Sequence, residues 1–253
     1  MKLRAPLKGI YFDAYWTLYR GHETLYPSQA IQENIEIPQT PWFFNKKMLE
    51  YIDLNTLANI PQERKAAAYE RALKYLDDNH FLMTEDDELK QWEEFHLMLA
   101  NDLPELNLNN EQIGAIAHSK VFGGGKLNLF DDTIPTLEAL TGKYKLGIIS
   151  DTWPSLESRL KISGIYDYFD SITFSCYLGT WKPNEEMYRH ALEQMKFPPE
   201  QTVFIDDSEV NLDGAVKCGI QPVLMAIGPN IIENTGKYPS INKLSELLEI
   251  LPE

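Results

Sequence analysis

The chain has 253 residues, of which 43% are apolar, which is enough for one large globular domain or for a core that carries an inserted domain. A formal charge of −15, without any lysine or arginine cluster, argues against a nucleic-acid surface and against binding to anionic lipid. Only two cysteines and an N-terminus without a long apolar run predict a cytoplasmic protein with no signal peptide and no membrane span.

The first predicted element is a buried strand over residues 7–12, LKGIYF, which ends directly before Asp13. Roughly a hundred residues with helical periodicity follow it. In the segment 65–78, one helical face collects the apolar side chains of Tyr69, Ala72, Leu73 and Leu76. Pro61 and Thr84 supply helix start signals. The sequence therefore predicts that a helical insertion interrupts an α/β domain after its first strand.

Short β-rich runs alternate with helix-like segments from about Leu127 onward. The runs are YKLGIIS, SITFS, TVFIDD and QPVLMAI, and the segments between them are SLESRLKISG, NEEMYRHALEQMK and EVNLDGAVKCG. This alternation is typical of a parallel sheet with crossover helices. We expect a three-layer, Rossmann-like α/β core of residues 1–20 and 123–253, with an inserted α-helical cap domain of residues 21–122.

Polar residues follow four of the predicted strands, at the edge where an open parallel sheet binds its ligands. In chain order they are Asp13 and Thr17, Ser150 and Asp151, Lys182, and finally Asp206, Asp207 and Asn211. Each of them alone also fits an ordinary turn, helix cap or loop residue. Their joint occurrence in this order indicates a functional site.

The motifs DAYWTL, IISD, KPNEEMY and IDDSEVN together resemble those of the haloacid dehalogenase-like (HAD) hydrolase superfamily. The resemblance covers the whole predicted core, and the helical insertion lies where that family places its small cap domain. It implies an aspartate nucleophile, a phosphate-binding serine or threonine, a lysine and an acidic metal loop. Family membership by itself does not choose the reaction.

The resemblance also implies a role for each motif residue. Asp13 would be the nucleophile that forms a covalent aspartyl intermediate, and Lys182 would neutralise charge on the nucleophile and the substrate. Ser150 and the backbone N–H groups after it would hold the oxygens of the transferring group. The other residues that we expect at the substrate site are Tyr15, Trp16, Thr17, Asp151 and Asn211, of which the last would orient Lys182 or its loop.

Mg²⁺ is the cofactor that the resemblance implies. Its ligands would be Asp13, Asp207 and the backbone carbonyl of Tyr15, with Asp206 beside the metal or its waters. Carboxylates that converge at neighbouring strand ends repel one another, so that without a cation at least one of them should take up a proton. Mg²⁺ with oxygen ligands and retained waters suits such a site.

Tyr15 departs from the phosphatases of the family, which carry a second aspartate there as general acid and base. A tyrosine with a pKa near ~10 is a poor base at neutral pH, and losing a positioned acid and base costs a factor of about 10²–10⁴ in rate. A D-x-Y start resembles instead the metal-free 2-haloacid dehalogenases, whose last motif lacks an acidic pair. The pair Asp206 and Asp207 favours the phosphatase.

Trp16 is a second departure, because the usual residue at its position is glycine, which lets the chain turn closely beneath the substrate. Its indole either packs between core and cap or contacts an aromatic or apolar group of the substrate. Trp153 and Trp181 also lie beside motifs. Three tryptophans would make the mouth of the site restrictive and partly apolar.

The sequence thus predicts a magnesium-dependent HAD-like hydrolase, a phosphatase that acts on a small phosphorylated metabolite through an aspartyl-phosphate intermediate. Two alternatives stay open: a metal-free 2-haloacid dehalogenase, and a family member that has lost turnover and binds a phosphorylated ligand or a partner protein. A small-molecule substrate is the expected partner, and neither nucleic acid nor a membrane is.

Overall fold

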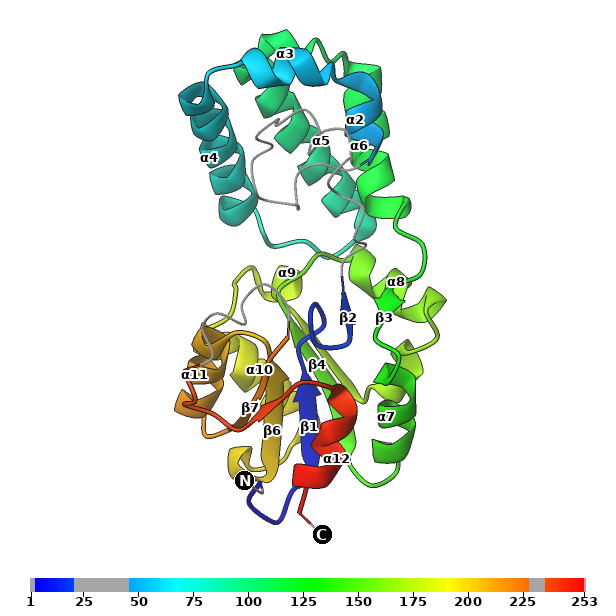
Figure 1. Cartoon of the computed structure of the whole chain (residues 1–253), viewed down its shortest axis with the longest axis vertical. Coiled ribbons are helices and arrows are strands. Elements are labelled where there is room, and N and C mark those ends of the chain that lie inside the picture. Colours follow the sequence, from blue (N-terminus) through cyan, green and yellow to red (C-terminus); the bar gives the residue numbers. More distant parts are fainter. Residues whose placement is uncertain (1–2, 21–45, 228–234, 253) are drawn as a thin grey trace. The chain divides into compact units, whose positions relative to one another are not determined.

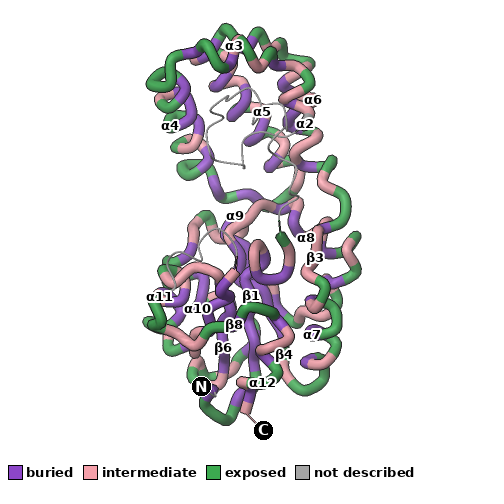
Figure 2. The backbone as a smooth tube through the Cα atoms, in the orientation of Figure 1, coloured by how far each residue is buried: buried purple, intermediate pink, exposed green. Residues whose placement is uncertain are grey.

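The computed structural model describes residues 3–20, 46–227 and 235–252. The chain divides into two compact units: unit 1 consists of Met1–Gly21 and Lys126–Glu253, and unit 2 of His22–Gly125 (Figure 1). Each unit has its own set of buried residues (Figure 2). Over the described ranges, no helix combines the length and the apolar character that a membrane span requires.

Unit 1 is built on a six-stranded sheet with the order β5-β4-β1-β6-β7-β8, and all the paired strands are parallel. The strands are β1 (Gly9–Phe12), β4 (Lys145–Ser150), β5 (Ser171–Phe174), β6 (Thr202–Asp206), β7 (Gln221–Met225) and β8 (Ser240–Ile241). In this register Phe12 pairs with Ile148 of β4 and Ile205 of β6, so β1 delivers Asp13 to the middle of the sheet edge. The predicted Rossmann-like parallel sheet is confirmed.

Helices flank this sheet on both sides (Figure 1). Helices α10 (Glu185–Met195) and α11 (Glu209–Lys217) contact each other and pack on β4 to β7. The elements α7 (Thr133–Leu140) and α12 (Leu247–Ile250) lie on the opposite side in Figure 1. The remaining helical elements of unit 1 are α8 (Ser155–Ile162), η3 (Tyr166–Tyr168), α9 (Ser175–Leu178), η4 (Pro199–Gln201) and η6 (Leu244–Glu246), and β2 (Tyr19–Arg20) pairs antiparallel with β3 (Asn128–Leu129).

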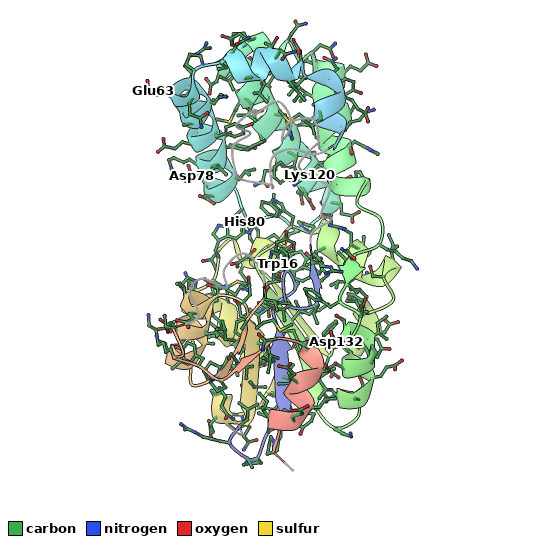
Figure 3. All side chains as sticks on the ribbon, viewed as in Figure 1. Trp16, Glu63, Asp78, His80, Lys120 and Asp132 are labelled. Carbon is green, nitrogen blue, oxygen red and sulfur yellow. The ribbon has the colours of Figure 1, made fainter. Side chains whose placement is uncertain are left out.

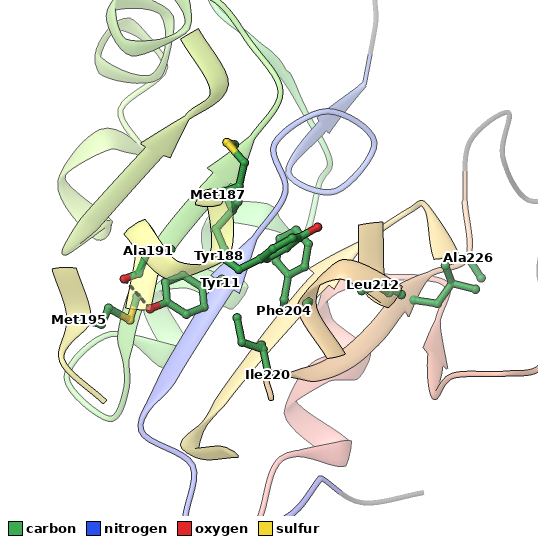
Figure 4. Packing of buried hydrophobic residues seen from close by; sticks show 12 residues of the cluster. Tyr11, Met187, Tyr188, Ala191, Met195, Phe204, Leu212, Ile220 and Ala226 are labelled. Carbon is green, nitrogen blue, oxygen red and sulfur yellow. Dashed lines mark hydrogen bonds between the residues drawn. The ribbon is translucent and has the colours of Figure 1, made fainter. Parts of the chain in front are cut away.

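The core between the sheet and α10/α11 holds the strand ends in place (Figure 4). Its members include Tyr11, Tyr188 and Phe204, all fully buried. The Tyr11 hydroxyl donates a hydrogen bond of 2.8 Å to the Ala191 carbonyl, which ties α10 to β1. Side chains of a strand point alternately to the two faces of the sheet. Since Tyr11 faces α10, its neighbours in β1 point to the opposite face. Phe12 there contacts Phe169 edge-on, with ring centroids 6.4 Å apart.

Unit 2 is helical in its described part. It contains α2 (Lys46–Tyr51), α3 (Leu54–Asn59), α4 (Gln62–Asp78), α5 (Glu85–Asp102), η2 (Pro104–Leu106) and α6 (Asn110–Phe122). The start signal at Thr84 is confirmed, since Thr84 and Asp87 form a reciprocal capping box on α5. Pro61 lies one position earlier than predicted, as the residue before the first helical position of α4.

Candidate active site

The carboxyl ends of β1, β4 and β6 bring the predicted site residues to one edge of the sheet. Asp13 follows β1, Ser150 is the last residue of β4, and Asp206 is the last residue of β6. All three side chains are buried, as is that of Lys182, which follows β5 and α9 in the chain. Parallel strands that end together explain how residues almost two hundred positions apart in the sequence become neighbours.

Lys182 lies at the centre of this group. Its ammonium donates to Asp13 Oδ1 at 2.6 Å, to Asp206 Oδ2 at 2.8 Å and to the Ile149 carbonyl at 3.3 Å. These three bonds use all three donors of an ammonium group. Burial alone would lower the pKa of Lys182, but the charges of Asp13 and Asp206 outweigh it and hold that pKa well above its ordinary value. The lysine is therefore a fixed cation.

Asp206 is fully buried and accepts bonds on both carboxylate oxygens. Oδ1 accepts from the Ser208 backbone N–H at 2.7 Å, and the Asn211 amide spans both oxygens at 3.2 and 3.1 Å. Asn211 is thus linked to Lys182 through Asp206. Tyr188 on α10 adds a bond of 2.7 Å to the Asn211 carbonyl, a support that no local sequence pattern pointed to.

Burial and the neighbouring carboxylates together oppose the ionisation of Asp13 more strongly than Lys182 favours it. Burial raises the pKa of Asp13 well above its ordinary value, Lys182 opposes this, and the charges of Asp206 and Asp207 raise the pKa further. Lys182 holds Oδ1, whereas Oδ2 accepts no hydrogen bond from the described part of the chain. A second cation at this edge would favour the ionised nucleophile.

Asp13, Asp206, Asp207 and the carbonyl of Tyr15 are oxygen donors of the kind that Mg²⁺ takes. Within the described ranges, no three side chains among His, Cys, Asp and Glu are gathered as a preformed metal cluster. Mg²⁺ commonly binds through one or two carboxylates and keeps several waters, so it does not require such a cluster. The donor chemistry and the raised pKa of Asp13 both fit this ion.

The turn after Asp13 contains the two residues that depart from the family pattern. Trp16 adopts a left-handed backbone with φ of 60°, and its N–H donates to the Tyr19 carbonyl at 2.7 Å. The Tyr15 ring contacts Trp16 and Tyr19, with centroids 5.5 and 5.6 Å away. Burial raises the pKa of Tyr15, the Trp16 side chain opposes this and the Asp207 charge adds to it, so the phenol stays protonated. Figure 3 shows Trp16 at the carboxyl end of the unit 1 sheet.

The loop that follows β4 is hydrogen-bonded to the loop that contains Lys182. Asp151 Oδ1 accepts the Lys182 backbone N–H at 2.9 Å. Thr152 forms two hydrogen bonds with Ser175, a residue that the sequence did not single out. The Thr152 backbone N–H donates to Ser175 Oγ at 2.8 Å, and the Ser175 hydroxyl donates to the Thr152 carbonyl at 3.1 Å. The ring of Trp153 packs edge-on against that of Trp181, at 5.6 Å. This pairing joins two of the predicted tryptophans.

Thr17 is a predicted site residue that the hydrogen-bond network of the site does not include. It is fully buried, and its hydroxyl has no hydrogen-bond partner among the described residues. The structure thus brings Asp13, Lys182, Asp206 and Asn211 into one bonded network and ties Asp151 to it.

A parallel α/β sheet with an aspartate, a lysine and an acidic loop at its carboxyl edge defines a HAD-type hydrolase core. The sequence profile of the haloacid dehalogenase-like hydrolases matches residues 7–219, and the chain belongs to this family of enzymes.

Characterised relatives match about half of the chain. A pyrimidine 5'-nucleotidase, YjjG, of Escherichia coli is 30% identical over 122 residues, which are 46% of this chain and 54% of that protein. A GMP/IMP nucleotidase, YrfG, of the same organism is 31% identical over 133 residues, 51% of this chain and 60% of that protein. A glyceraldehyde 3-phosphate phosphatase of Methanothermobacter thermautotrophicus is 30% identical over 135 residues, 49% and 59%.

Solved structures match over nearly the whole chain. A 2-haloacid dehalogenase from Pseudomonas syringae superposes with a TM-score of 0.61 at 18% identity, covering 97% of this chain and 98% of that one. A HAD phosphatase from Thermococcus onnurineus superposes with a TM-score of 0.58 at 25% identity, covering 96% and 97%. The fold is therefore shared by dehalogenases and phosphatases.

Proposed function

We propose that the chain is a magnesium-dependent phosphatase that cleaves small phosphorylated metabolites through an aspartyl-phosphate on Asp13. The observation that carries this proposal is the buried ion pair of Lys182 with Asp13 and Asp206 at the carboxyl edge of the sheet. Burying charged groups costs desolvation free energy even when they are paired, and clusters of buried charges are commonly found at functional sites.

The free oxygen of Asp13 suits nucleophilic attack. Lys182 fixes Oδ1, so Oδ2 is the atom that attacks phosphorus, and the P–O bond to the leaving group breaks. The Lys182 charge stabilises the negative charge of the transferring phosphoryl group. Ser150 and the backbone N–H groups after it bind the non-bridging oxygens. Water then opens the aspartyl-phosphate, which releases inorganic phosphate and restores Asp13.

Mg²⁺ would be held by Asp13, Asp207 and the carbonyl of Tyr15, with Asp206 next to its waters. When bound, the ion neutralises phosphate charge and orients the phosphoryl group. The raised pKa of Asp13 supports this proposal, because a cation would restore the carboxylate that attack requires.

The relatives support a phosphate monoester as substrate. Two of those described above are named nucleotidases and one is named a glyceraldehyde 3-phosphate phosphatase. Since the chain spans only 54% to 60% of their length, these names support the reaction class and do not identify the substrate.

Tyr15 favours one competing function, dehalogenation of a 2-haloacid. A halide leaves without a proton, so the weakly acidic phenol at this position would cost such a reaction nothing. The acidic residues Asp206 and Asp207 favour the phosphatase, because a metal-free reaction does not need two further carboxylates at the strand end beside the nucleophile.

One assay separates these functions. Purified protein and the Asp13→Asn variant are incubated with phosphomonoesters and with 2-haloacids, in Mg²⁺ and in EDTA. We expect phosphate release that requires both Mg²⁺ and Asp13. Halide release in EDTA would replace the phosphatase by the dehalogenase, and ligand binding without any turnover would point to a binding protein.

A further inference from the structure

The proposed phosphoryl transfer needs a proton donor for the leaving oxygen and a base for water. Lys182 cannot easily serve, because its three protons are committed to Asp13, Asp206 and the Ile149 carbonyl. Tyr15 is a poor donor and a poor base, because burial raises the pKa of its phenol. A different side chain must carry the proton if alkyl esters are substrates.

Asp151 has the position and the geometry for this task. It is the first residue after β4, and β4 is the direct neighbour of β1, which delivers Asp13. Its Oδ1 is fixed by the Lys182 backbone N–H at 2.9 Å. Within the described part of the chain, Oδ2 receives no hydrogen bond. Oδ1 of Asp151 is thus held in place, and Oδ2 is available for proton transfer. Asp151 lies two residues after Ile149, whose carbonyl also accepts a hydrogen bond from Lys182.

The chemistry of this carboxyl group is consistent with proton transfer. Burial raises the pKa of Asp151 above its ordinary value, the Lys182 charge and backbone bond lower it, and Asp206 adds a smaller increase. Tyr188 also lies within electrostatic reach. A carboxyl group whose pKa moves toward neutrality is a better acid–base catalyst at neutral pH than an ordinary aspartate.

We propose that Asp151 is the general acid and base of this enzyme, in a role that rests on the proposed phosphatase function. In the first step Asp13 Oδ2 bonds to phosphorus, the P–O bond to the leaving group breaks, and the leaving oxygen takes the proton of the Asp151 carboxyl. In the second step the Asp151 carboxylate takes a proton from water as that water bonds to phosphorus. The bond from phosphorus to Asp13 breaks, and Asp151 is protonated again.

The test compares phosphate esters whose leaving groups differ in their need for a proton. p-Nitrophenolate leaves readily as an anion, whereas an alkoxide does not. Asp151→Asn keeps an oxygen that can accept the Lys182 N–H and removes only the acid. We expect this variant to lose a factor of about 10²–10⁴ in kcat/KM with an alkyl phosphate and less than about tenfold with p-nitrophenyl phosphate. Asp167→Asn, at an exposed aspartate of the same unit, should match the unsubstituted protein.

A second measurement addresses the second step. With p-nitrophenyl phosphate, Asp151→Asn should release a burst of nitrophenolate close to one per enzyme, because the aspartyl-phosphate forms and then waits for a base. Asp151→Glu, which retains an acid, should recover part of the alkyl phosphate turnover that Asp151→Asn loses.

Two results would overturn the role of Asp151 and leave the phosphatase intact. One is an equal loss for alkyl and nitrophenyl esters without a burst, which would make Asp151 a support for the lysine loop alone. The other is unchanged kinetics in Asp151→Asn. If instead the unsubstituted protein releases no phosphate that depends on Asp13, the phosphatase proposal itself fails, and the role of Asp151 fails with it.

Discussion

At the scale of single residues, Lys182 is the group on which the most interactions depend. Replacing it by methionine would leave Asp13 and Asp206 buried without their common partner. We expect Lys182→Met to lower the free energy of unfolding by about 3–5 kcal/mol and to lower kcat by at least about 10²-fold. Urea unfolding and steady-state kinetics measure the two effects.

Lys145 provides the matched control, because it pairs with Asp170 at the surface, with side chains that are 58% and 36% exposed. Lys145→Met should change the stability by no more than about 1 kcal/mol and leave turnover unaltered. If Lys182→Met and Lys145→Met lower the free energy of unfolding equally, the buried ion pair contributes no more to stability than the surface pair.

Trp16 carries backbone strain that its side chain must offset. A left-handed conformation costs a residue with a Cβ atom about 1–2 kcal/mol, and glycine adopts it freely. Both Trp16→Gly and Trp16→Ala lose the ring contact with Tyr15. We therefore expect the glycine variant to be the more stable of the two by about 1 kcal/mol in thermal or urea unfolding.

Trp153 is not among the described residues with a positive φ and serves as the control. At this position we expect the opposite order of stability, with Trp153→Ala more stable than Trp153→Gly. Should alanine also be favoured at position 16, the turn after Asp13 does not hold the left-handed conformation in solution.

The resemblance gave Asp206 and Asp207 different roles at the metal, but the sequence did not predict the hydrogen-bond partners of either residue. The structure directs Asp206 to Lys182 and Asn211, through partners that lie in separate elements. Local patterns identified the residues of the site, whereas their hydrogen-bond partners follow from the packing of α10, α11 and the sheet.

At the scale of elements, the long apolar runs were the readable part of the sequence. The strands β1, β4, β5, β6 and β7 all lie within predicted runs, because short runs of apolar and β-branched residues leave a clear signal. The two-residue strands β2, β3 and β8 were missed. These strands pair through backbone groups that the surrounding fold places next to each other. A strand of two residues is too short to show an alternation of apolar and polar side chains.

Helix α5 contains a buried histidine. His96 contacts the Trp92 carbonyl through Nδ1 at 2.6 Å. Burial lowers the pKa of His96 from 6.5 to about 4, the Trp92 bond opposes this, and the charge of Lys120 lowers it further. Figure 3 labels Lys120, whose ammonium lies 4.8 Å from the centre of the Trp92 ring. His96 is therefore neutral in the folded protein.

The depressed pKa makes stability depend on pH. In the unfolded chain His96 binds a proton as the pH falls below 6.5, whereas in the folded protein it binds one only near pH 4. The folded state therefore loses stability as the pH falls from 6.5 to about 4. Between pH 6.5 and 5 the loss amounts to at most about 2 kcal/mol. In His96→Gln, urea unfolding should show a decline smaller by this amount. The exposed His118→Gln serves as control, and a decline unchanged in His96→Gln would mean that His96 is accessible to protons in the folded state.

At the scale of the whole molecule, the charge of −15 complicates any test for a bound metal. Any added salt screens the repulsion among 38 acidic side chains, so that stabilisation by Mg²⁺ does not by itself identify a site. A specific site differs in two respects: its effect saturates with ligand concentration, and it disappears when a single ligand is removed.

The carboxylates Asp206 and Asp207 next to Asp13 predict a specific effect of Mg²⁺ beyond screening. At a Mg²⁺ concentration about 100 times its Kd, binding would stabilise the folded state by about 2.7 kcal/mol, which for a chain of this size raises Tm by about 5–10 °C. EDTA should reverse the shift, and NaCl of equal ionic strength should reproduce little of it. Asp207→Asn should abolish the saturable part, whereas Asp167→Asn, which removes one surface charge, should retain it. If both variants respond alike, the shift is bulk screening of an acidic protein, and the carboxylates beside Lys182 must be satisfied without a bound ion.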